Sequence, residues 1–315
     1  MNQPLLLGIE IGGTKLQAAL GDSRGRIAHL LQTSANPEGG ATAIINQLEE
    51  MIEKLLKSRE DPPAGSGIGF GGPINALQGT VTKSNHVAGW DNFPLKKWAE
   101  TTFGIPCMIG NDTDVAALAE ARVASRKDDH CVFYTNIGSG IGGGLVFDGK
   151  LYERSGGAME VGHTRVYSSR QQRHGILEDF CSGWSLNACA RDAARQDTNS
   201  ALWQKAEKVE DIDARHLFAA WQAGDIRATE VVDDFLDCYA RAMSNIIAVL
   251  NPDVIVIGGG LSRVGQPLLN AIRERIRPLV YAPFKDSTRI ELTHYGDEVV
   301  PVGAILLAAE NLEHR

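Results

Sequence analysis

The sequence predicts an α/β protein of two lobes, because two observations coincide. First, its 315 residues exceed the length at which a single hydrophobic core stops growing, about 250–300 residues, so two cores are expected. Second, a strand, a glycine turn and a further strand follow one another twice, in Leu5–Gly21 and again in His130–Asp148. Two hairpins of like design indicate a duplicated lobe, and segments of helical periodicity complete the α/β class.

The first lobe is expected to span residues 1–118. Its expected strands are Leu5–Ile11, Lys15–Gly21, Ser66–Phe70 and Pro106–Ile109, and its expected helices are Thr42–Lys57 and Val115–Val123. The first of these helices is predicted from apolar residues that recur at helical spacing. Asn111 or Asp112 is placed to cap the second helix.

The second lobe is expected to span residues 119–303. Its expected strands are His130–Ile137, Leu145–Asp148 and Val254–Ile257, with a glycine loop at Gly138–Gly144. Helical periodicity dominates Ser182–Leu250, with interruptions near Gln196–Ser200 and Gly224. The closing helix Ala304–Leu312 is expected to pack back on the first lobe, so residues 304–315 are assigned to that lobe.

Composition excludes several classes of protein. The net charge is −8 and no block of Lys or Arg is present, which argues against binding to a nucleic-acid backbone. The five cysteines are isolated, without a CxxC pair, as expected for reduced thiols. The N-terminus has no basic segment with a cleavage site, and no apolar stretch approaches the roughly 20 residues of a membrane span. We therefore expect a cytoplasmic protein that binds neither nucleic acid nor membrane.

Both glycine turns are of a kind that holds phosphate oxygens. The first, Gly8-Ile-Glu-Ile-Gly-Gly-Thr-Lys15, puts two glycines, a hydroxyl and a cation on one tight turn. The second, Gly138-Ser-Gly-Ile-Gly-Gly-Gly144, has small residues that let backbone amides face an anion. One such turn is more often only a hairpin, whereas two facing turns can clamp a triphosphate. The GxxxxGK[ST] loop is absent and neither turn opens a long helix, so P-loop and dinucleotide-binding folds are excluded.

Together these motifs resemble the ROK group (repressor, open reading frame, kinase) of the hexokinase–actin superfamily, over nearly the whole chain. The segments that carry the resemblance are Glu10-Ile-Gly-Gly-Thr-Lys15, Gly71-Gly72-Pro73, Asn111-Asp112, Gly138–Gly144, Glu160-Val-Gly-His163, Leu177-Glu178 before Ser182-Gly183, and Ile257-Gly-Gly-Gly-Leu261. The resemblance implies a two-lobed actin-like ATPase (ribonuclease H-like) fold, with a central cleft between the lobes that closes on its ligands. It also implies an ATP-dependent sugar kinase that forms a homodimer.

The resemblance further implies roles for individual residues. The nucleotide would be bound by the two turns and by a third glycine segment near the adenosine: Gly12, Gly13, Thr14 and Lys15, then Gly138, Ser139, Gly140 and Gly142, then Gly258, Gly259 and Gly260. Sugar hydroxyls would meet Asn85, Asn111, Asp112, Glu160, His163 and Glu178. Asp112 would be the catalytic base that phosphoryl transfer needs near the attacking hydroxyl. Glu10 would approach Mg²⁺ through water.

Two features depart from the family pattern. Many members bind a structural zinc through the His that matches His163 and three cysteines before the Glu that matches Glu178, yet residues 164–177 contain no cysteine. A structural zinc is therefore not expected, and Arg173 or His174 is left to help position His163. Glu10 stands where most members have Asp, but its longer side chain still reaches magnesium through water.

The sequence also leaves structural interpretations open. These are helix capping alone for Asn111 and Asp112, an exposed strand lysine for Lys15, a strand-edge charge for Glu10, and a metal or core pair for Glu160 and His163. Trp90 is expected to pack rather than to stack on a ligand, and Cys181 to be an inert buried thiol.

The predicted activity is ATP-dependent phosphorylation of a hexose, at the 6-hydroxyl. Glucose is the first candidate, ahead of N-acetylmannosamine, N-acetylglucosamine, fructose and allose, and polyphosphate is an alternative donor. A sugar-responsive repressor of the same family would carry a helix-turn-helix before the first turn, and we expect none. A catalytically silent sugar-binding regulatory protein is the remaining alternative, against which Asp112 argues.

Overall fold

The computed structural model describes residues 4–57, 61–84, 87–152 and 159–313, and the chain divides into two compact units. The first unit comprises Met1–Ser125, Gly144–Ala158 and Asp297–Arg315, and the second comprises Arg126–Gly143 and Met159–Gly296. The expected boundary between residues 118 and 119 lies within a helix of the first unit, α3 (Asp112–Ala124).

The first unit is built on a five-stranded sheet in the order β3-β2-β1-β4-β7. Its strands are β1 (Leu6–Ile11), β2 (Lys15–Gly21), β3 (Ile27–Ser34), β4 (Ser66–Phe70) and β7 (Cys107–Asn111). β1 pairs antiparallel with β2 and parallel with β4, and β4 pairs parallel with β7. The strands predicted for this lobe are confirmed with small shifts at their ends, whereas the edge strand β3 was not predicted, because most of its residues are exposed.

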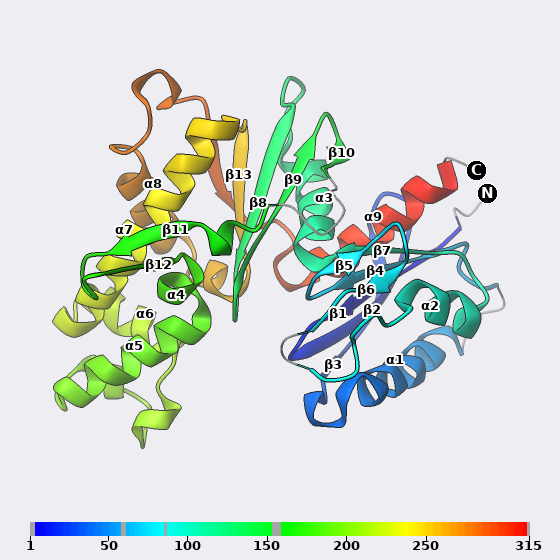
Figure 1. The fold of residues 1–315 in the computed structure, drawn as a ribbon, viewed down its shortest axis with the longest axis horizontal. Helices are drawn as coiled ribbons and strands as arrows, with labels where there is room; N and C mark the ends of the chain where they lie inside the picture. Colours follow the sequence, from blue (N-terminus) through cyan, green and yellow to red (C-terminus); the bar gives the residue numbers. More distant parts are fainter. Residues whose placement is uncertain (1–3, 58–60, 85–86, 153–158, 314–315) are drawn as a thin grey trace. The chain divides into compact units, whose positions relative to one another are not determined.

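Helices cover both faces of this sheet (Figure 1). They are α1 (Gly40–Leu56), α2 (Leu95–Phe103), α3 and α9 (Val299–Glu313). Alternate residues of β1 point to opposite faces: Leu7 and Ile9 join the core cluster that includes α1, whereas Leu6 packs with Ile305 of α9. The closing helix α9 therefore lies on the first sheet, beside α3.

Glycines allow α9 to approach both the sheet and α3 unusually closely. A Cβ atom on Gly67 of β4 would lie 1.9 Å from the carbonyl oxygen of Ala304, and one on Gly303 would lie 1.8 Å from that of Val115. No larger residue fits at either position. This packing fixes the start of α3, where Asp112 lies.

A small hairpin and an aromatic cluster complete the first unit. The hairpin consists of β5 (Ile74–Asn75) and β6 (Thr80–Val81). Trp90 is 1% exposed and makes edge-to-face contacts with Phe70 and Phe93, each with ring centroids 5.0 Å apart. The prediction that Trp90 is a packing residue is confirmed.

The second unit contains most of a second five-stranded sheet, in the order β10-β9-β8-β13-β14. Its strands are β8 (Cys131–Ile137), β9 (Ile141–Phe147), β10 (Lys150–Leu151), β13 (Val254–Gly258) and β14 (Arg289–Leu292). β13 pairs parallel with β8 and with β14. As in the first sheet, three strands consecutive along the chain are followed by two later ones, which matches the duplicated design that the sequence predicted. The division between the units runs through β9, whose residues from Gly144 onward cluster with the first unit.

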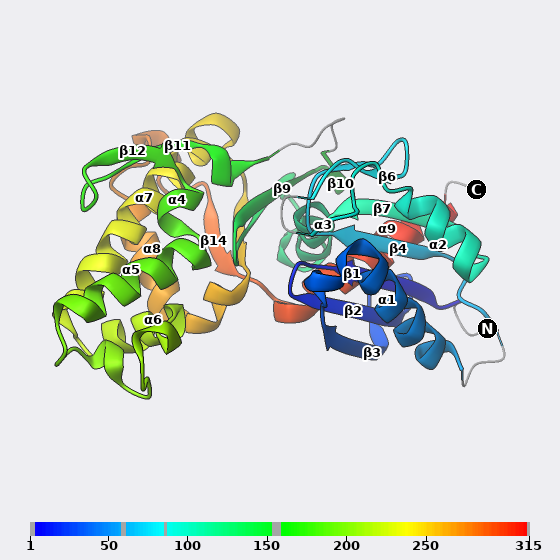
Figure 2. The ribbon, with the colours of Figure 1, turned by 60° about the horizontal axis from the view of Figure 1, so that its bottom comes forward.

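The rest of the second unit is largely helical. Its elements are the hairpin β11 (Arg165–Ser168) and β12 (Arg173–Ile176), and the helices α4 (Glu178–Cys181), α5 (Gly183–Gln196), α6 (Ala214–Gln222), α7 (Ile226–Leu250) and α8 (Gln266–Ile276). Figure 2 shows α5, α6 and α7 side by side. The predicted helical region is confirmed, with its interruptions widened to residues 197–213 and 223–225.

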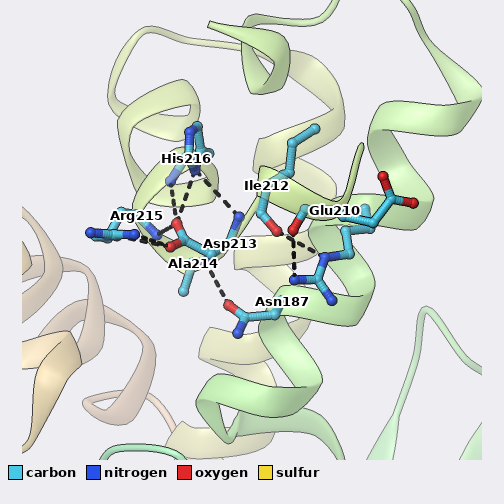
Figure 3. A network of polar contacts seen from close by, with 8 residues as sticks. Asn187, Glu210, Ile212, Asp213, Ala214, Arg215 and His216 are labelled. Carbon is cyan, nitrogen blue, oxygen red and sulfur yellow. Dashed lines mark hydrogen bonds and ion pairs between the residues drawn. The ribbon is translucent and has the colours of Figure 1, made fainter. Parts of the chain in front are cut away.

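A polar network fixes the connection from α5 to α6 (Figure 3). Asp213 caps α6, because its carboxylate accepts hydrogen bonds from the N–H groups of Arg215 at 2.9 Å and His216 at 3.3 Å. Asn187 of α5 accepts another from the N–H of Ala214 at 2.7 Å. Burial alone raises the pKa of Asp213, but the bonds from Arg215 and His216 outweigh it and bring the pKa down to about 2.

Candidate functional site

The parallel strands of the first unit end together at one edge of their sheet. Ile11, Phe70 and Asn111 are paired neighbours at the ends of β1, β4 and β7. The residues that follow them are Gly12, Gly71 and Asp112. The carboxyl ends of parallel strands are the usual ligand-binding edge of an α/β sheet. The register therefore brings the first glycine turn and the predicted base to one place.

The first glycine turn is open at its tip. The N–H of Gly12 donates to the carbonyl of Lys15 at 3.0 Å, which closes the turn. Gly13 and Thr14 are exposed, and a Cβ atom on Gly13 would meet nothing within 4 Å. The turn thus presents accessible backbone, as a phosphate-binding turn must.

Buried Glu10 and partly exposed Lys15 form an ion pair beneath this turn. Glu10 Oε2 lies 2.9 Å from Lys15 Nζ, and the ammonium also donates to the carbonyl of Asp297 at 3.1 Å. Burial is the main reason why the pKa of Glu10 rises to about 7; Lys15 opposes the rise, and the nearby charges of Asp112 and Asp297 add to it. Glu10 lies on the central strand β1 and is 8% exposed, so the strand-edge interpretation is wrong. Lys15 is paired rather than a freely exposed lysine.

Asn111 caps α3 and so fixes the backbone at Asp112. Asn111 Oδ1 accepts from the N–H of Thr113 at 2.9 Å, and Asn111 Nδ2 donates to the carbonyl of Gly72 at 3.1 Å. Asp112 Oδ1 also accepts from Thr113 N–H, at 2.8 Å. A Cβ atom on Gly71 would lie 3.4 Å from Asp112 Oδ2, so this oxygen is near the first turn. The predicted cap is confirmed for Asn111, and it leaves Asp112 directed toward the ligand-binding edge.

The second glycine turn is shorter than predicted, because β9 already begins at Ile141. Gly138 N–H donates to the carbonyl of Gly140 at 2.9 Å. Gly142 is a strand residue, and its N–H donates to the side chain of Asn136 at 2.7 Å. Ser139 is exposed at the tip. The accessible part of this turn is therefore limited to residues 138–140.

Glu178 and the start of α5 hold the second turn. Glu178 Oε2 accepts from the N–H of Ile141 at 2.7 Å, and a Cβ atom on Gly140 would lie 2.7 Å from the same oxygen. On the other side, Gly183 N–H donates to the carbonyl of Gly138 at 2.7 Å. Glu178, predicted to contact sugar, thus also supports the turn predicted to bind phosphate.

The third glycine segment lies beside the second turn. β13 and β8 are parallel, and Gly258 pairs with Asn136. Gly259 has φ +79°, and a Cβ atom there would lie 2.6 Å from the carbonyl group of Ile137. Only glycine fits such a position. Gly260 is exposed at the start of a 3₁₀ helix, Gly260–Val264. The structure therefore brings Gly138–Gly140 and Gly258–Gly260 to one edge of the second sheet.

The remaining predicted sugar residues lie on exposed backbone of the second unit. Glu160 and His163 are exposed and flank a 3₁₀ turn, Val161–His163, in which His163 N–H donates to the carbonyl of Glu160 at 3.0 Å. A core-histidine role for His163 is therefore wrong. Arg173 lies over the ring of Phe180 at 4.5 Å rather than against His163. Asn85 lies outside the described residues.

Sequence reasoning missed two residues that the structure brings to these turns. Asp297 reaches the Glu10–Lys15 pair from a 3₁₀ turn, Gly296–Glu298, before α9. Asn136 fixes the start of β9. Asn136 lies two residues before Gly138 and could have been noticed as a polar residue near a strand end, whereas no local signal marks Asp297. Cys181 is fully buried, and burial raises its pKa, as expected of an inert thiol.

The residues around Glu10 fit a magnesium–nucleotide complex. Mg²⁺ prefers oxygen ligands and is usually held by one or two carboxylates together with phosphate oxygens and water, which suits Glu10 with Asp112 and Asp297 nearby. Among the described residues, no group of three or more His, Cys, Asp or Glu side chains could hold a metal by itself. None of the described helices combines the length and the apolar character that crossing a membrane requires.

Comparison with known proteins agrees with this geometry. The family described as "ROK family" matches residues 6–311. A glucokinase from Thermotoga maritima is 29% identical over 313 residues, covering 98% of each chain. An N-acetylmannosamine kinase from Salmonella typhi is 29% identical over 309 residues, covering 96% of this chain and 97% of its own. The crystal structure of a ROK family glucokinase from Streptomyces griseus, in complex with glucose and AMPPNP, superposes with a TM-score of 0.85 at 26% identity, covering 97% of this chain and 99% of that chain. The likeness confirms the predicted α/β, actin-like ATPase fold.

Proposed function

This chain belongs to the ROK family, and we propose that it transfers the γ-phosphoryl group of ATP to the 6-hydroxyl of a hexose, with glucose as the first candidate. The observation that carries the proposal is the strand register that brings Gly12, Gly71 and Asp112 to one sheet edge. A glycine turn for phosphate and a carboxylate for the acceptor hydroxyl are the two parts that such a transfer needs.

Asp112 is proposed as the general base. Its position as the first residue of α3 is fixed by the Asn111 cap, and Oδ2 lies on the side of Gly71. A carboxylate there would accept the proton of the attacking hydroxyl as the new bond to phosphorus forms. Asn111 would hold a neighbouring sugar hydroxyl, since its amide can both donate and accept.

ATP is proposed to bind through the glycine segments of both units. Gly12–Lys15 and Gly138–Gly140 would meet the phosphates, and Gly258–Gly260 the adenosine. Bound Mg²⁺ would neutralise phosphate charge, with Glu10 holding one of its water ligands. Lys15 would move from Glu10 toward a phosphate oxygen when the nucleotide is present.

The relatives include kinases of two classes of acceptor sugar. The Thermotoga protein is a glucokinase and the Salmonella protein is an N-acetylmannosamine kinase. Glu160, His163 and Glu178 are proposed to read the sugar hydroxyls from the second unit. Glu160 and His163 are exposed and Glu178 is partly exposed, and their carboxylate oxygens and imidazole nitrogens can form hydrogen bonds to a polyol.

The test is ADP release with Mg-ATP against a panel of free hexoses and N-acetylhexosamines, repeated with polyphosphate as donor. We expect one sugar, glucose, to give the highest kcat/KM, and the Asp112→Asn protein serves as the control for a contaminating kinase. Sugar binding without turnover of any sugar would instead establish a sugar-binding regulatory protein.

A further inference from the structure

The β11–β12 hairpin joins two residues of the proposed sugar site. His163 lies just before β11, and Glu178 opens α4 just after β12. The N–H of Leu177 donates to the carbonyl of Thr164 at 2.8 Å, which ties the two ends together. A displacement of the hairpin would therefore move both His163 and Glu178.

One face of α7 holds this hairpin, and both ribbon views show the two side by side (Figures 1 and 2). Asp234, Cys238 and Arg241 follow one another at spacings of four and three, which places them on a single helical face. Cys238 Sγ donates to the carbonyl of Tyr167 at 3.6 Å, and Arg241 donates to the same oxygen.

Asp234 makes the central contact with the turn of the hairpin. Its side chain is buried, at 8% exposure. Oδ2 accepts from the hydroxyl of Ser168 at 2.6 Å, and Oδ1 accepts from the N–H of Arg170 at 3.1 Å. The Ser168 hydroxyl oxygen in turn accepts from the N–H of Gln171 at 3.0 Å. A buried carboxylate is costly unless its oxygens are hydrogen-bonded, so these bonds favour a single position of the hairpin turn.

We propose that Asp234 is a positioning residue for the sugar site: it holds the turn of the β11–β12 hairpin and thereby sets the places of His163 and Glu178. The inference rests on the proposed function, because it assumes that these two side chains meet the sugar. Among the described residues, no hydrogen bond joins Asp234 to either His163 or Glu178.

Cys189 of α5 gives an independent readout of the hairpin. Of the five cysteines, Cys189 alone is partly exposed and the other four are buried. Gln171 Nε2 of the hairpin turn donates to Cys189 Sγ at 3.8 Å. The hairpin turn therefore partly covers the thiol, and the rate at which a small alkylating reagent modifies Cys189 reports how often the turn lifts.

The experiment compares Asp234→Ala and Asp234→Asn with the wild type. In Asp234→Ala we expect the KM for sugar to rise about tenfold, because a charge-assisted hydrogen-bond pair is lost, with kcat changed by less than about twofold. Cys189 should be alkylated faster. Asn keeps one acceptor oxygen, so its effects should be intermediate. Asp233→Asn is the matched control, since Asp233 lies next to Asp234 on α7 but pairs with Arg275 of α8.

An unchanged KM for sugar in folded Asp234→Ala would overturn the proposal. An equal rise in the KM of Asp233→Asn would overturn it too. If Asp234→Ala does not fold, Ser168→Ala removes the hydroxyl that donates to Asp234 and accepts from Gln171 N–H, while Asp234 keeps its bond to Arg170, and the result is read in the same way. If the wild type phosphorylates no sugar, the proposed kinase activity fails, and the sugar dissociation constant from calorimetry replaces KM for judging Asp234.

Discussion

The two glycine turns occupy equivalent places in sheets of the same strand order, but different interactions hold them. Beneath the first turn lies an ion pair, Glu10 with Lys15, joined by the backbone of Asp297. The second turn is held by hydrogen bonds to the side chain of Asn136 and to the backbone of Gly183 and by the carboxylate of Glu178. The first turn is therefore held by an ion pair, whereas the second is held by hydrogen bonds, one of which goes to a carboxylate.

We expect this difference to give the two units separate tasks. The first unit carries the predicted base and the carboxylates suited to magnesium, so substitutions there should act on chemistry. The second unit carries a hydrogen-bonded turn that shares Glu178 with the proposed sugar site, so substitutions there should act on binding.

The largest effect is expected from Asp112→Asn in the first unit. Loss of the base should lower kcat by roughly 10²–10⁴-fold, while the dissociation constant for sugar changes little because the amide still hydrogen-bonds. Steady-state kinetics and calorimetry measure the two quantities. Asp114→Asn, in the same turn of α3, is the matched control and should keep turnover near the wild-type value. Unchanged turnover in Asp112→Asn would remove Asp112 from the role of base.

A smaller effect is expected from Gly140→Ala in the second unit. The new Cβ atom would lie 2.7 Å from Glu178 Oε2, so the flexible carboxylate must move while the backbone stays in place. We expect the KM for both substrates to rise, with kcat/KM falling by about tenfold from loss of a charge-assisted hydrogen bond.

Gly138→Ala provides the matched comparison for Gly140→Ala. A Cβ atom there would have Gly140 O as its nearest neighbour, at 3.9 Å, an ordinary contact. Glu178 should therefore stay in place, so the KM for sugar should stay near the wild-type value, while the KM for Mg-ATP rises because Gly138 is itself proposed to meet phosphate. If both alanine variants behave alike, the position of Glu178 does not control binding, and the proposed task of the second turn is wrong.

The same contrast explains what the sequence could predict. The strands that end in glycine or Asn-Asp were found because apolar runs and turn residues are local signals, and for the same reason Asn111 or Asp112 was predicted to cap α3. Asp297 could not be found, because it meets Lys15 across 282 residues of chain. Only tertiary packing of α9 brings it there.

The second turn was predicted too long for a different physical reason. Glycines usually mark a loop, yet Gly143 and Gly144 are strand residues. A Cβ atom on Gly143 would lie 2.6 Å from the carbonyl oxygen of Met159, and one on Gly144 would lie 2.5 Å from that of Thr113. These glycines permit close packing of a strand rather than a turn, and the sequence alone does not distinguish the two uses.

The pH dependence of kcat/KM should distinguish the first turn, beside Glu10, from the second turn, beside Glu178. If ionised Glu10 supports the magnesium complex, kcat/KM for Mg-ATP should fall roughly fourfold between pH 8 and pH 6.5, as expected for one group with a pKa of about 7. Glu10→Gln should have lower activity without this pH dependence. Substitution at Glu178, by contrast, should leave the profile in place. A wild-type profile that stays flat across this range would show that ionisation of Glu10 is not needed.

Stability gives a second test of the same carboxyl group. Because the pKa of Glu10 is raised from 4.5 to about 7 on folding, the folded protein binds the proton more tightly than the unfolded chain. Its contribution to the free energy of unfolding is full below pH 4.5 and is lost as the pH rises through 7. Urea unfolding at pH 5 and pH 8 should show a smaller difference in Glu10→Gln than in the wild type. An equal difference in both proteins would place the pH dependence elsewhere.

The smallest effect on catalysis is expected from Asp213→Ala, at the cap of α6. Loss of the cap should lower the free energy of unfolding by about 1 kcal/mol at pH 7 while KM and kcat stay unchanged, because the network of Figure 3 involves neither glycine turn. The pKa of Asp213 is lowered from 3.8 to about 2, so the contribution of the cap persists above pH 4 and disappears as the pH falls toward 2. The variant and the wild type should therefore converge in stability under acid, when compared by urea unfolding. A change in KM would mean that α5 transmits the state of this cap to Gly183 and the second turn, and the second unit would then be less rigid than its hydrogen bonds imply.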